Sequence, residues 1–242
     1  MDAPPQFERT RILLDADEQM RLASAHVLVA GLGGVGSYCA EALARAGVGR
    51  LTIIDHDVVA ASNINRQLPA LLSTIGQPKA EVMAARIRDI HPACELTVIR
   101  EFLVPETVAD IVPADVDFVI DCIDSLNCKV ALVATSVERG LKVASSMGAG
   151  NKLDPTRIRI ADISKTSMCP LAAVMRKRLR KRGIAKGVLT VFSDEPGRAP
   201  LPPQPVEGRG RARAVNGTIS YLPPLFGLML AGAVVQRLIA ES

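Results

Sequence analysis

The fold is decided by residues 26–67, which read HVLVAGLGGVGSYCAEALARAGVGRLTIIDHDVVAASNINRQ. A short apolar run at 26–30 enters the glycine turn GLGGVG at 31–36, and a helix-like stretch of small and apolar residues follows. A β-branched run at 51–54 then ends in Asp55. This order of strand, glycine turn, helix, strand and acid is the context of a dinucleotide fingerprint, in which glycines let the backbone approach a phosphate at the start of a helix. The stretch therefore predicts a nucleotide site, with Asp55 placed to accept hydrogen bonds from a ribose.

Strand-like and helix-like segments alternate along the rest of the chain, which predicts an α/β fold with a doubly wound, mostly parallel, Rossmann-like sheet. The further strands are expected at 96–99, 116–120, 142–145, 157–163 and 188–192. The further helices are expected at 7–22, 78–90, 105–111, 127–139 and 170–182, with a buried helix in the apolar tail 221–235. We expect one domain over 1–242, with a nucleotide-binding core at 1–150 and a C-terminal extension of strands and helices at 151–242. Residues 194–217 are rich in Pro, Gly and Arg, and we expect them to be mobile or ordered only by a partner.

Composition and charge narrow the class of protein. The net charge is +4, yet residues 157–213 alone carry 14 Lys and Arg against 4 Asp and Glu. Such a basic block fits a polyanionic partner, although a solvated helix face with a loose loop would look the same. Aromatic residues make up only 3% of the chain, which disfavours a protein that binds single strands by stacking bases.

The five cysteines are scattered and form no CxxC pair, as expected of a protein in a reducing cytoplasm without a structural zinc. Residues 1–10 are polar and contain no apolar segment of a signal peptide. The apolar tail is about fifteen residues long, whereas a membrane helix needs roughly twenty. We therefore expect a cytoplasmic protein without stable membrane insertion.

Charged residues at successive strand ends bear on the choice between NAD and ATP. Arg66 and Lys79 follow the second strand, and Asp124 follows the fourth. An ATP enzyme needs cations on the phosphates and a carboxylate for magnesium, and these residues supply them. An NAD enzyme would need a His or Lys acid/base, but none of the three histidines looks like a catalytic acid with an obvious partner, although His56 lies between two aspartates. The pattern favours ATP.

Four segments resemble the ThiF/MoeB superfamily of adenylating enzymes, which are related to ubiquitin-activating enzymes. They are GLGGVG, TIIDHDVVAASNINRQ, GQPKAEV and IDCIDS. The resemblance implies that Asp55 binds the ribose, that Asn63, Arg66 and Lys79 contact phosphate, and that Asp124 positions magnesium for adenylation. It also implies a homodimer in which Arg9 reaches the ATP of the partner subunit.

The expected catalytic residues are Arg9, Arg66, Lys79 and Asp124, with Asp124 as the metal ligand. The expected nucleotide-binding residues are Gly31, Gly33, Gly34, Gly36, Asp55, Asp57, Asn63, Arg66, Gln67, Lys79 and Asp124. For Asp57, a supporting role in the site and a loop-capping role both remain open.

The C-terminal part resembles the tRNA threonylcarbamoyladenosine dehydratases in ADISKTSMCPLAAVMRKRLRKRGI, VFSDEP and LPPLFGLMLAGAVVQRL. This resemblance implies Mg-ATP as cofactor and tRNA as partner. The threonyl carboxylate would be activated as an acyl-adenylate or acyl-phosphate, and attack by the carbamoyl group would close a ring with net loss of water. The basic helix at 176–182 and the loop arginines Arg209, Arg211 and Arg213 would bind tRNA phosphates.

Other functions remain open from the sequence. The main alternative is an adenylyltransferase for a ubiquitin-like sulfur carrier, and the missing CxxC pairs count against it. A non-catalytic nucleotide-binding adaptor is a weaker one. Cys169 precedes a helix start beside a basic face, so a sulfur-transfer role with a cysteine desulfurase system is open, with an inert thiol favoured.

Overall fold

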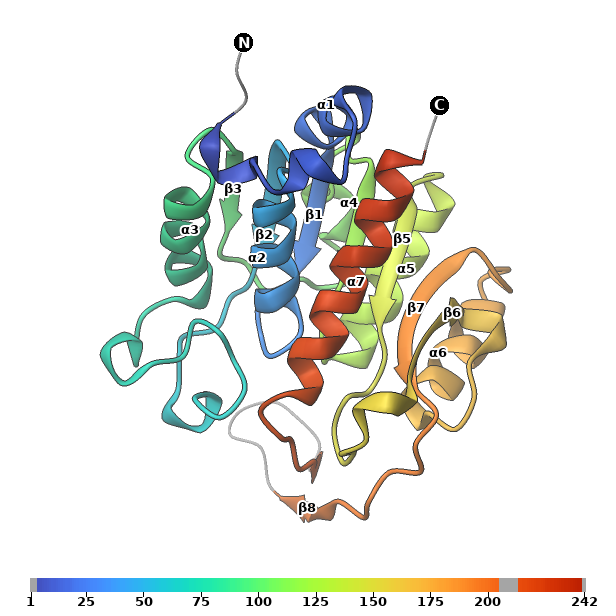
Figure 1. Ribbon diagram of the computed structural model, residues 1–242. Coiled ribbons are helices and arrows are strands. Elements are labelled where there is room, and N and C mark those ends of the chain that lie inside the picture. Colours follow the sequence, from blue (N-terminus) through green and yellow to red (C-terminus); the bar gives the residue numbers. More distant parts are fainter. Residues whose placement is uncertain (1–3, 205–212, 241–242) are drawn as a thin grey trace.

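A computed structural model describes residues 4–204 and 213–240 of the chain. Its centre is a seven-stranded sheet in the order β3-β2-β1-β4-β5-β7-β6 (Figure 1). The strands are β1 (His26–Ala30), β2 (Arg50–Ile54), β3 (Glu95–Ile99), β4 (Phe118–Asp121), β5 (Lys142–Ser146), β6 (Ile158–Asp162) and β7 (Val188–Ser193). All neighbours pair in parallel except β6, which runs antiparallel to β7. The predicted doubly wound, mostly parallel sheet is confirmed.

Helices cover both faces of the sheet (Figure 1). One face carries α1 (Ala16–Ser24), α2 (Gly36–Ala46), α3 (Lys79–Ile90) and α7 (Leu222–Ile239). The other carries α4 (Val108–Ile111), α5 (Leu126–Glu138) and α6 (Pro170–Arg180). The central strand β1 is buried along its length. Val27 and Val29 pack in the apolar core between the sheet and the first set of helices, whereas Leu28 packs in the apolar core on the other face. A strand with helices on both faces is apolar throughout, as a parallel sheet requires.

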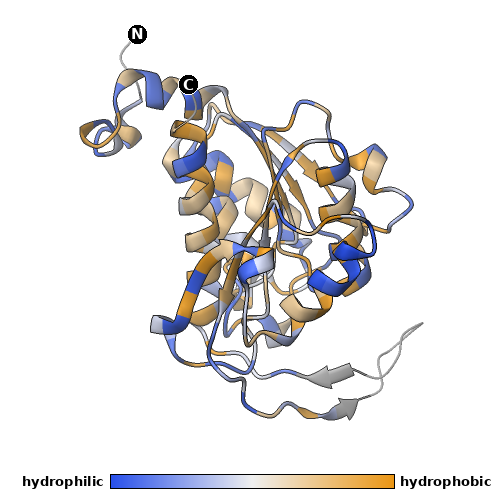
Figure 2. Ribbon diagram, turned by 90° about the vertical axis from the view of Figure 1, so that its right-hand side faces the viewer, coloured by the Kyte–Doolittle hydropathy of each residue, from blue (hydrophilic) through white to orange (hydrophobic). Residues whose placement is uncertain are grey.

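The C-terminal helix α7 is a core helix, as expected for the apolar tail. It is 18 residues long with a mean hydropathy of 1.6, enough by length and composition to cross a membrane, yet 56% of it is buried within the protein. The ribbon of α7 carries mostly hydrophobic colours in Figure 2, consistent with its burial against the neighbouring helices and the sheet. It packs closely on α2, because a Cβ on Gly227 would lie 2.2 Å from the carbonyl oxygen of Val35.

The expected helix at 7–22 is wrong. Two 3₁₀ turns, Pro5–Phe7 and Thr10–Ile12, precede a helix that begins only at residue 16. The physical reason is a capping box: Asp15 accepts from the Glu18 backbone N–H at 2.8 Å, while the Glu18 side chain accepts from the Asp15 N–H at 2.9 Å. The reciprocal cap fixes the start of the helix there. The helix expected at 105–111 is likewise shortened, to α4.

The segment 194–217 differs from the expected irregular loop where the structure describes it. Residues Leu201–Gln204 form β8 and Arg213–Val215 form β9, and the two pair antiparallel in a separate small sheet. Arg209 and Arg211 lie outside the described residues, so the predicted phosphate contacts of these arginines stay predictions.

Candidate active site

A cavity of about 530 Å³ opens at the carboxyl ends of β1, β2, β4 and β5. This edge lies where the strand order reverses between β1 and β4, which is where open α/β sheets bind ligands. All of the expected nucleotide-binding residues line the cavity except Gly36, which lies just behind it at the start of α2. The lining set is Gly31, Gly33, Gly34, Asp55, Asp57, Asn63, Arg66, Gln67, Lys79 and Asp124.

The glycine turn can be built only from glycine at its ends. Gly31 has a φ of +89°, and a Cβ on it would lie 2.8 Å from the carbonyl oxygen of Cys122. A Cβ on Gly36 would lie 1.7 Å from the carbonyl oxygen of Gly31. The turn therefore closes on itself before α2, which begins without a side-chain cap and so presents its first N–H groups to an anion.

Asp55 holds this turn in place as well as facing the cavity. Its carboxylate accepts hydrogen bonds from the backbone N–H of Leu32 at 2.6 Å and of Asp57 at 2.8 Å. The side chain thus ties the end of β2 to the glycine turn of β1. A carboxylate oxygen can accept more than one hydrogen bond, so the ribose role remains chemically open to it.

Gln67 has a buried side-chain oxygen that is suited to accept a hydrogen bond from a ligand. The residue is 9% exposed, and its Oε1 atom has no hydrogen-bond partner among the described residues. Its Nε2 atom lies 3.7 Å from the position of a Cβ on Gly33, so the amide faces the turn. A buried polar atom without a partner is costly, and a hydrogen-bonding ligand on the turn would satisfy it.

Lys79 and Asp57 form an ion pair at the cavity wall, with Nζ 2.8 Å from Oδ2. The Lys79 side chain is only 6% exposed, whereas that of Asp57 is half exposed. Lys79 lies in the first turn of α3, where the helix dipole disfavours a positive charge. The carboxylate of Asp57 offsets this effect. Asp57 Oδ1 also lies 3.0 Å from His56 Nε2, so one of the two flanking aspartates is close to this histidine.

Arg66 and Asn63 lie on the loop after β2. Arg66 donates from Nη1 to the carbonyl oxygen of Ser62 at 3.0 Å and to Oδ1 of Asn65 at 2.8 Å. Its partial burial lowers the pKa of Arg66, as expected for a cation that lacks a carboxylate partner. Asn63 accepts from the backbone N–H of Ala60 at 3.1 Å, so its oxygen caps the local turn and its amide nitrogen is left for the cavity.

Asp124 is exposed at the cavity, and behind it lies a buried network that sequence reasoning missed. Asp121 is 0% exposed and lies 2.7 Å from Lys129 Nζ, whose side chain is 1% exposed. Asp121 also accepts from Ser145 Oγ at 2.5 Å. Burial raises the pKa of Asp121, and the charge of Lys129 opposes the rise. The signal in the sequence was a lone lysine in the apolar helix LNCKVALVATSVE.

This network holds Ile123, the residue before Asp124, by both of its backbone polar groups. The Ile123 N–H donates to Asp121 Oδ1 at 3.1 Å, and the Ile123 carbonyl accepts from Lys129 Nζ at 3.0 Å. The position of Asp124 is therefore set by a buried ion pair that does not itself reach the cavity.

Arg9 does not reach this cavity within its own chain. It is exposed beside the turn at Thr10–Ile12, and the N-terminal segment lies at the opposite end of the sheet from the cavity (Figure 1). Phe7 anchors the segment there by packing edge-on against His91, with ring centroids 4.9 Å apart. Only a second copy of the chain could bring Arg9 to a nucleotide.

Cys169 is buried, 3% exposed, at the N-terminus of α6. Its Sγ atom lies 3.7 Å from the position of a Cβ on Gly148, and Gly148 lines the cavity. The thiol thus lies behind the cavity wall, as expected of the inert alternative.

Sequence reasoning did not select other lining residues. His56 and Phe102 stack edge to face with ring centroids 4.5 Å apart, and Phe102 offers an apolar wall beside Asp55. A polar wall of small residues lies on the other side and consists of Ser146, Gly148, Gly150, Asn216 and Thr218. The run SSMGAG at a strand end was the available signal for its first part.

Among the described residues, metal donors gather at Asp55, His56 and Asp57, whose ligand atoms lie within 4.8 Å of one another. The carboxylates of Asp55 and Asp57 are already bonded to backbone N–H groups and to Lys79, respectively. Asp124 has no such partner among the described residues.

Residues 7–241 match the ThiF family. A tRNA threonylcarbamoyladenosine dehydratase of Bacillus subtilis (strain 168) is 42% identical over 250 residues, which cover 98% of this chain and 95% of the relative. One from Haemophilus influenzae is 39% identical over 242 residues, covering 95% and 92%. The crystal structure of the E. coli tRNA N6-threonylcarbamoyladenosine dehydratase in complex with ATP superposes with a TM-score of 0.86 at 37% identity, covering 97% of this chain and 94% of that one.

Proposed function

The chain belongs to the ThiF family, and we propose that it catalyses the ATP-dependent dehydration of threonylcarbamoyladenosine in tRNA. The observation that carries the proposal is the extent of the match. Relatives with this activity align over nearly the whole chain, including the C-terminal extension after residue 150. That extension supplies part of the cavity, through Asn216 and Thr218.

The cavity fits ATP on its own chemistry. The glycine turn and the uncapped start of α2 suit the phosphates, and the unpartnered Gln67 oxygen offers an acceptor. Asp55 would bind the ribose. Arg66 and Lys79 both line the cavity, where their charges would neutralise the phosphates and the charge that develops in the transition state.

ATP activates the threonyl carboxylate: one carboxylate oxygen becomes bonded to the α-phosphorus with release of pyrophosphate, or to the γ-phosphorus with release of ADP. The carbamoyl group then attacks the activated carbonyl carbon, and that oxygen departs with the phosphorus. The sum is the loss of one water from the nucleoside. The protein's part is to hold the carboxylate in line with the phosphate and to supply fixed positive charge, and neither task needs an enzyme nucleophile. The buried Cys169 is consistent with this requirement.

Magnesium fits the donor set at Asp124. The carboxylate is exposed at the cavity and has no partner among the described residues, and hard oxygen ligands are those that Mg²⁺ prefers. A bound magnesium ion would neutralise phosphate charge. In its absence, Asp124 is kept in place by the buried network of Asp121 and Lys129.

We further propose a homodimer in which Arg9 acts on the partner subunit's nucleotide. Beside Arg9, Ile12 is 72% exposed and Leu13 is 84% exposed. Adjacent apolar side chains this exposed are typical of an interaction surface. Since the substrate is tRNA, the enzyme is expected to act in the cytoplasm.

The proposal is tested by mass spectrometry of nucleosides from tRNA that carries threonylcarbamoyladenosine. Incubation with the protein and Mg-ATP should yield a nucleoside lighter by one water, and omission of ATP should abolish it. Failure to form this product, combined with ATP–pyrophosphate exchange driven by the Gly-Gly terminus of a carrier protein, would instead support the sulfur-carrier alternative.

A further inference from the structure

The two chain segments around β8 and β9 form an arm beside the cavity. Its outgoing leg is residues 194–204 and its return leg is residues 213–218. The legs pair through β8 and β9, and the return leg contributes Asn216 and Thr218 to the cavity wall. The contacts that hold the return leg in place therefore also shape the side of the cavity away from Asp55.

Asn151 binds the arm with all four of its polar groups. Its backbone N–H donates to the Gly217 carbonyl at 2.8 Å, and its Oδ1 accepts from the Gly217 N–H at 2.7 Å. Its Nδ2 donates to Asn216 Oδ1 at 2.8 Å. Its carbonyl accepts from the backbone N–H of Arg198, on the outgoing leg, at 2.7 Å.

The backbone of Asn151 is left-handed, with a φ of +61°. Outside glycine this conformation is uncommon, and asparagine is one of the residues that tolerate it best. The preceding residue is also constrained, because a Cβ on Gly150 would lie 3.2 Å from Asn216 Cβ. The local backbone is thus shaped to meet the return leg.

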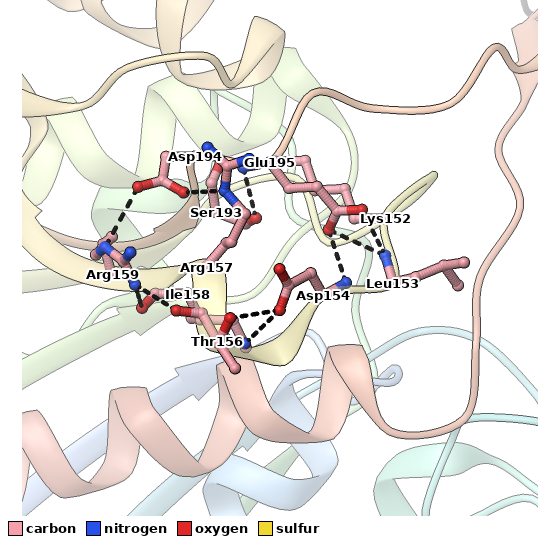
Figure 3. Close-up of polar contacts among 10 residues, drawn as sticks. All are labelled: Lys152, Leu153, Asp154, Thr156, Arg157, Ile158, Arg159, Ser193, Asp194 and Glu195. Atoms are coloured by element: carbon pink, nitrogen blue, oxygen red, sulfur yellow. Dashed lines mark hydrogen bonds and ion pairs between the residues drawn. The ribbon is translucent and has the colours of Figure 1, made fainter.

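The outgoing leg has anchors of its own (Figure 3). The Glu195 carboxylate accepts from the backbone N–H groups of Leu153 at 3.0 Å and Asp154 at 2.9 Å. Asp194 pairs with Arg157 at 2.8 Å. Loss of the Asn151 side chain would therefore remove two of the hydrogen bonds that hold the return leg while leaving the outgoing leg attached.

The return leg is also linked to the phosphate side of the cavity. Asn65 donates from Nδ2 to the Thr218 carbonyl at 3.1 Å, and its Oδ1 accepts from Arg66 Nη1 at 2.8 Å. Residues 216–218 thus lie between Asn151 on one side and the chain that carries Arg66 on the other. This places a polar wall beside the expected phosphate cations.

We infer that residues 216–218 form the wall against which the RNA substrate docks, and that Asn151 is the positioning residue that holds this wall. The inference rests on the proposed function. The opposite wall, with Asp55 and the glycine turn, is taken by ATP, which leaves this one for the acyl group of the modified adenosine. The outgoing leg carries Asp194, Glu195 and Arg198, but both acids are already bonded to the loop at 153–157. The exposed Arg198 is therefore the charge of this leg left for an RNA phosphate, which favours RNA over a protein.

The test compares Asn151→Gly with the wild-type protein in the dehydration assay, with KM measured separately for tRNA and for ATP. Glycine accepts the positive φ, so this variant removes only the two side-chain hydrogen bonds to the return leg. We expect KM for tRNA to rise about tenfold, because the wall loses two of the hydrogen bonds that fix its position. KM for ATP should change by less than about twofold, since the nucleotide wall is untouched.

Two further variants make the result specific. Asn216→Ala removes the partner amide from the return leg and should reproduce the rise in KM for tRNA. Thr156→Ala is the matched control: this residue lies in the same loop, and within the part of the chain that the structure describes its side chain bonds only to Asp154, at 2.6 Å, so both constants should stay at wild-type values.

An unchanged KM for tRNA in both asparagine variants, with wild-type dehydration intact, would overturn the inference and leave the proposed function standing. An equal rise in both Michaelis constants would overturn it too, because it would mean a general structural role. If the wild-type protein fails to dehydrate tRNA, the proposed function itself fails, and the inference with it.

Discussion

At the residue scale, a substitution of Asp124 tests the site assignment most directly. Asp124→Ala should lower kcat for dehydration by about a hundredfold or more, because it removes the carboxylate expected to position magnesium. The melting temperature should stay near that of the wild type, since Asp124 is exposed and unpaired among the described residues. Asp110→Ala, an exposed carboxylate on α4 away from the cavity, is the control. Full activity at native stability would remove Asp124 from the site.

The residues of the site could be predicted to different degrees. Gly31, Asp55 and Lys79 follow from the order of strand, turn and helix, since parallel strands bring their carboxyl ends to one edge. The sequence could not predict which protein groups these side chains contact before a ligand binds. The pairing of Lys79 with Asp57 joins residues 22 apart in the chain, and only the folded backbone brings them to 2.8 Å.

At the element scale, the connection between β4 and α5 depends on a buried ion pair. Lys129→Met should destabilise the protein by about 3–5 kcal/mol, because it leaves the Asp121 carboxylate buried without its cation. The double variant Asp121→Asn with Lys129→Met should recover much of that loss, since no charge then remains buried. Urea unfolding at neutral pH measures both.

The two variants are expected to differ from wild type in activity as well. Each should lower kcat, because the peptide at Ile123 loses one or both of the hydrogen bonds that place Asp124. A double variant less stable than Lys129→Met alone would contradict the account of the pair.

Elements with long apolar periodicity were predictable, and elements set by local polar contacts were not. The strands and helices of the core agree with expectation because each follows the burial pattern of a two-faced parallel sheet. The N-terminal helix was expected to begin too early, because the Asp15–Glu18 capping box that fixes its start at residue 16 was not recognised. Strand β8 was missed because Pro202 and Pro203 argue against a strand, although proline is tolerated in an edge strand.

At the scale of the whole molecule, the proposed dimer predicts complementation between two inactive variants. Arg9→Ala and Asp124→Ala should each be nearly inactive alone. A mixed dimer contains one intact site, in which the Asp124 of one subunit meets the Arg9 of the other. Equal mixing with subunit exchange should therefore recover about a quarter of wild-type activity.

The control for complementation is the mixture of Asp124→Ala with Lys79→Met. Each of these substitutions damages the nucleotide cavity of the subunit that carries it. That mixed dimer has no intact site and should stay inactive. If native mass spectrometry shows subunit exchange but the Arg9→Ala and Asp124→Ala mixture recovers no activity, Arg9 takes no part in the reaction.

The most direct measurement follows the oxygen of the threonyl carboxylate. tRNA labelled with heavy oxygen in that carboxylate is incubated with the protein and Mg-ATP, and the phosphate-containing products are analysed by mass spectrometry. The account predicts one labelled oxygen in AMP, for an acyl-adenylate, or in inorganic phosphate, for an acyl-phosphate, together with a nucleoside lighter by one water. Loss of water from the nucleoside with no label in either product would contradict activation of the carboxylate by ATP.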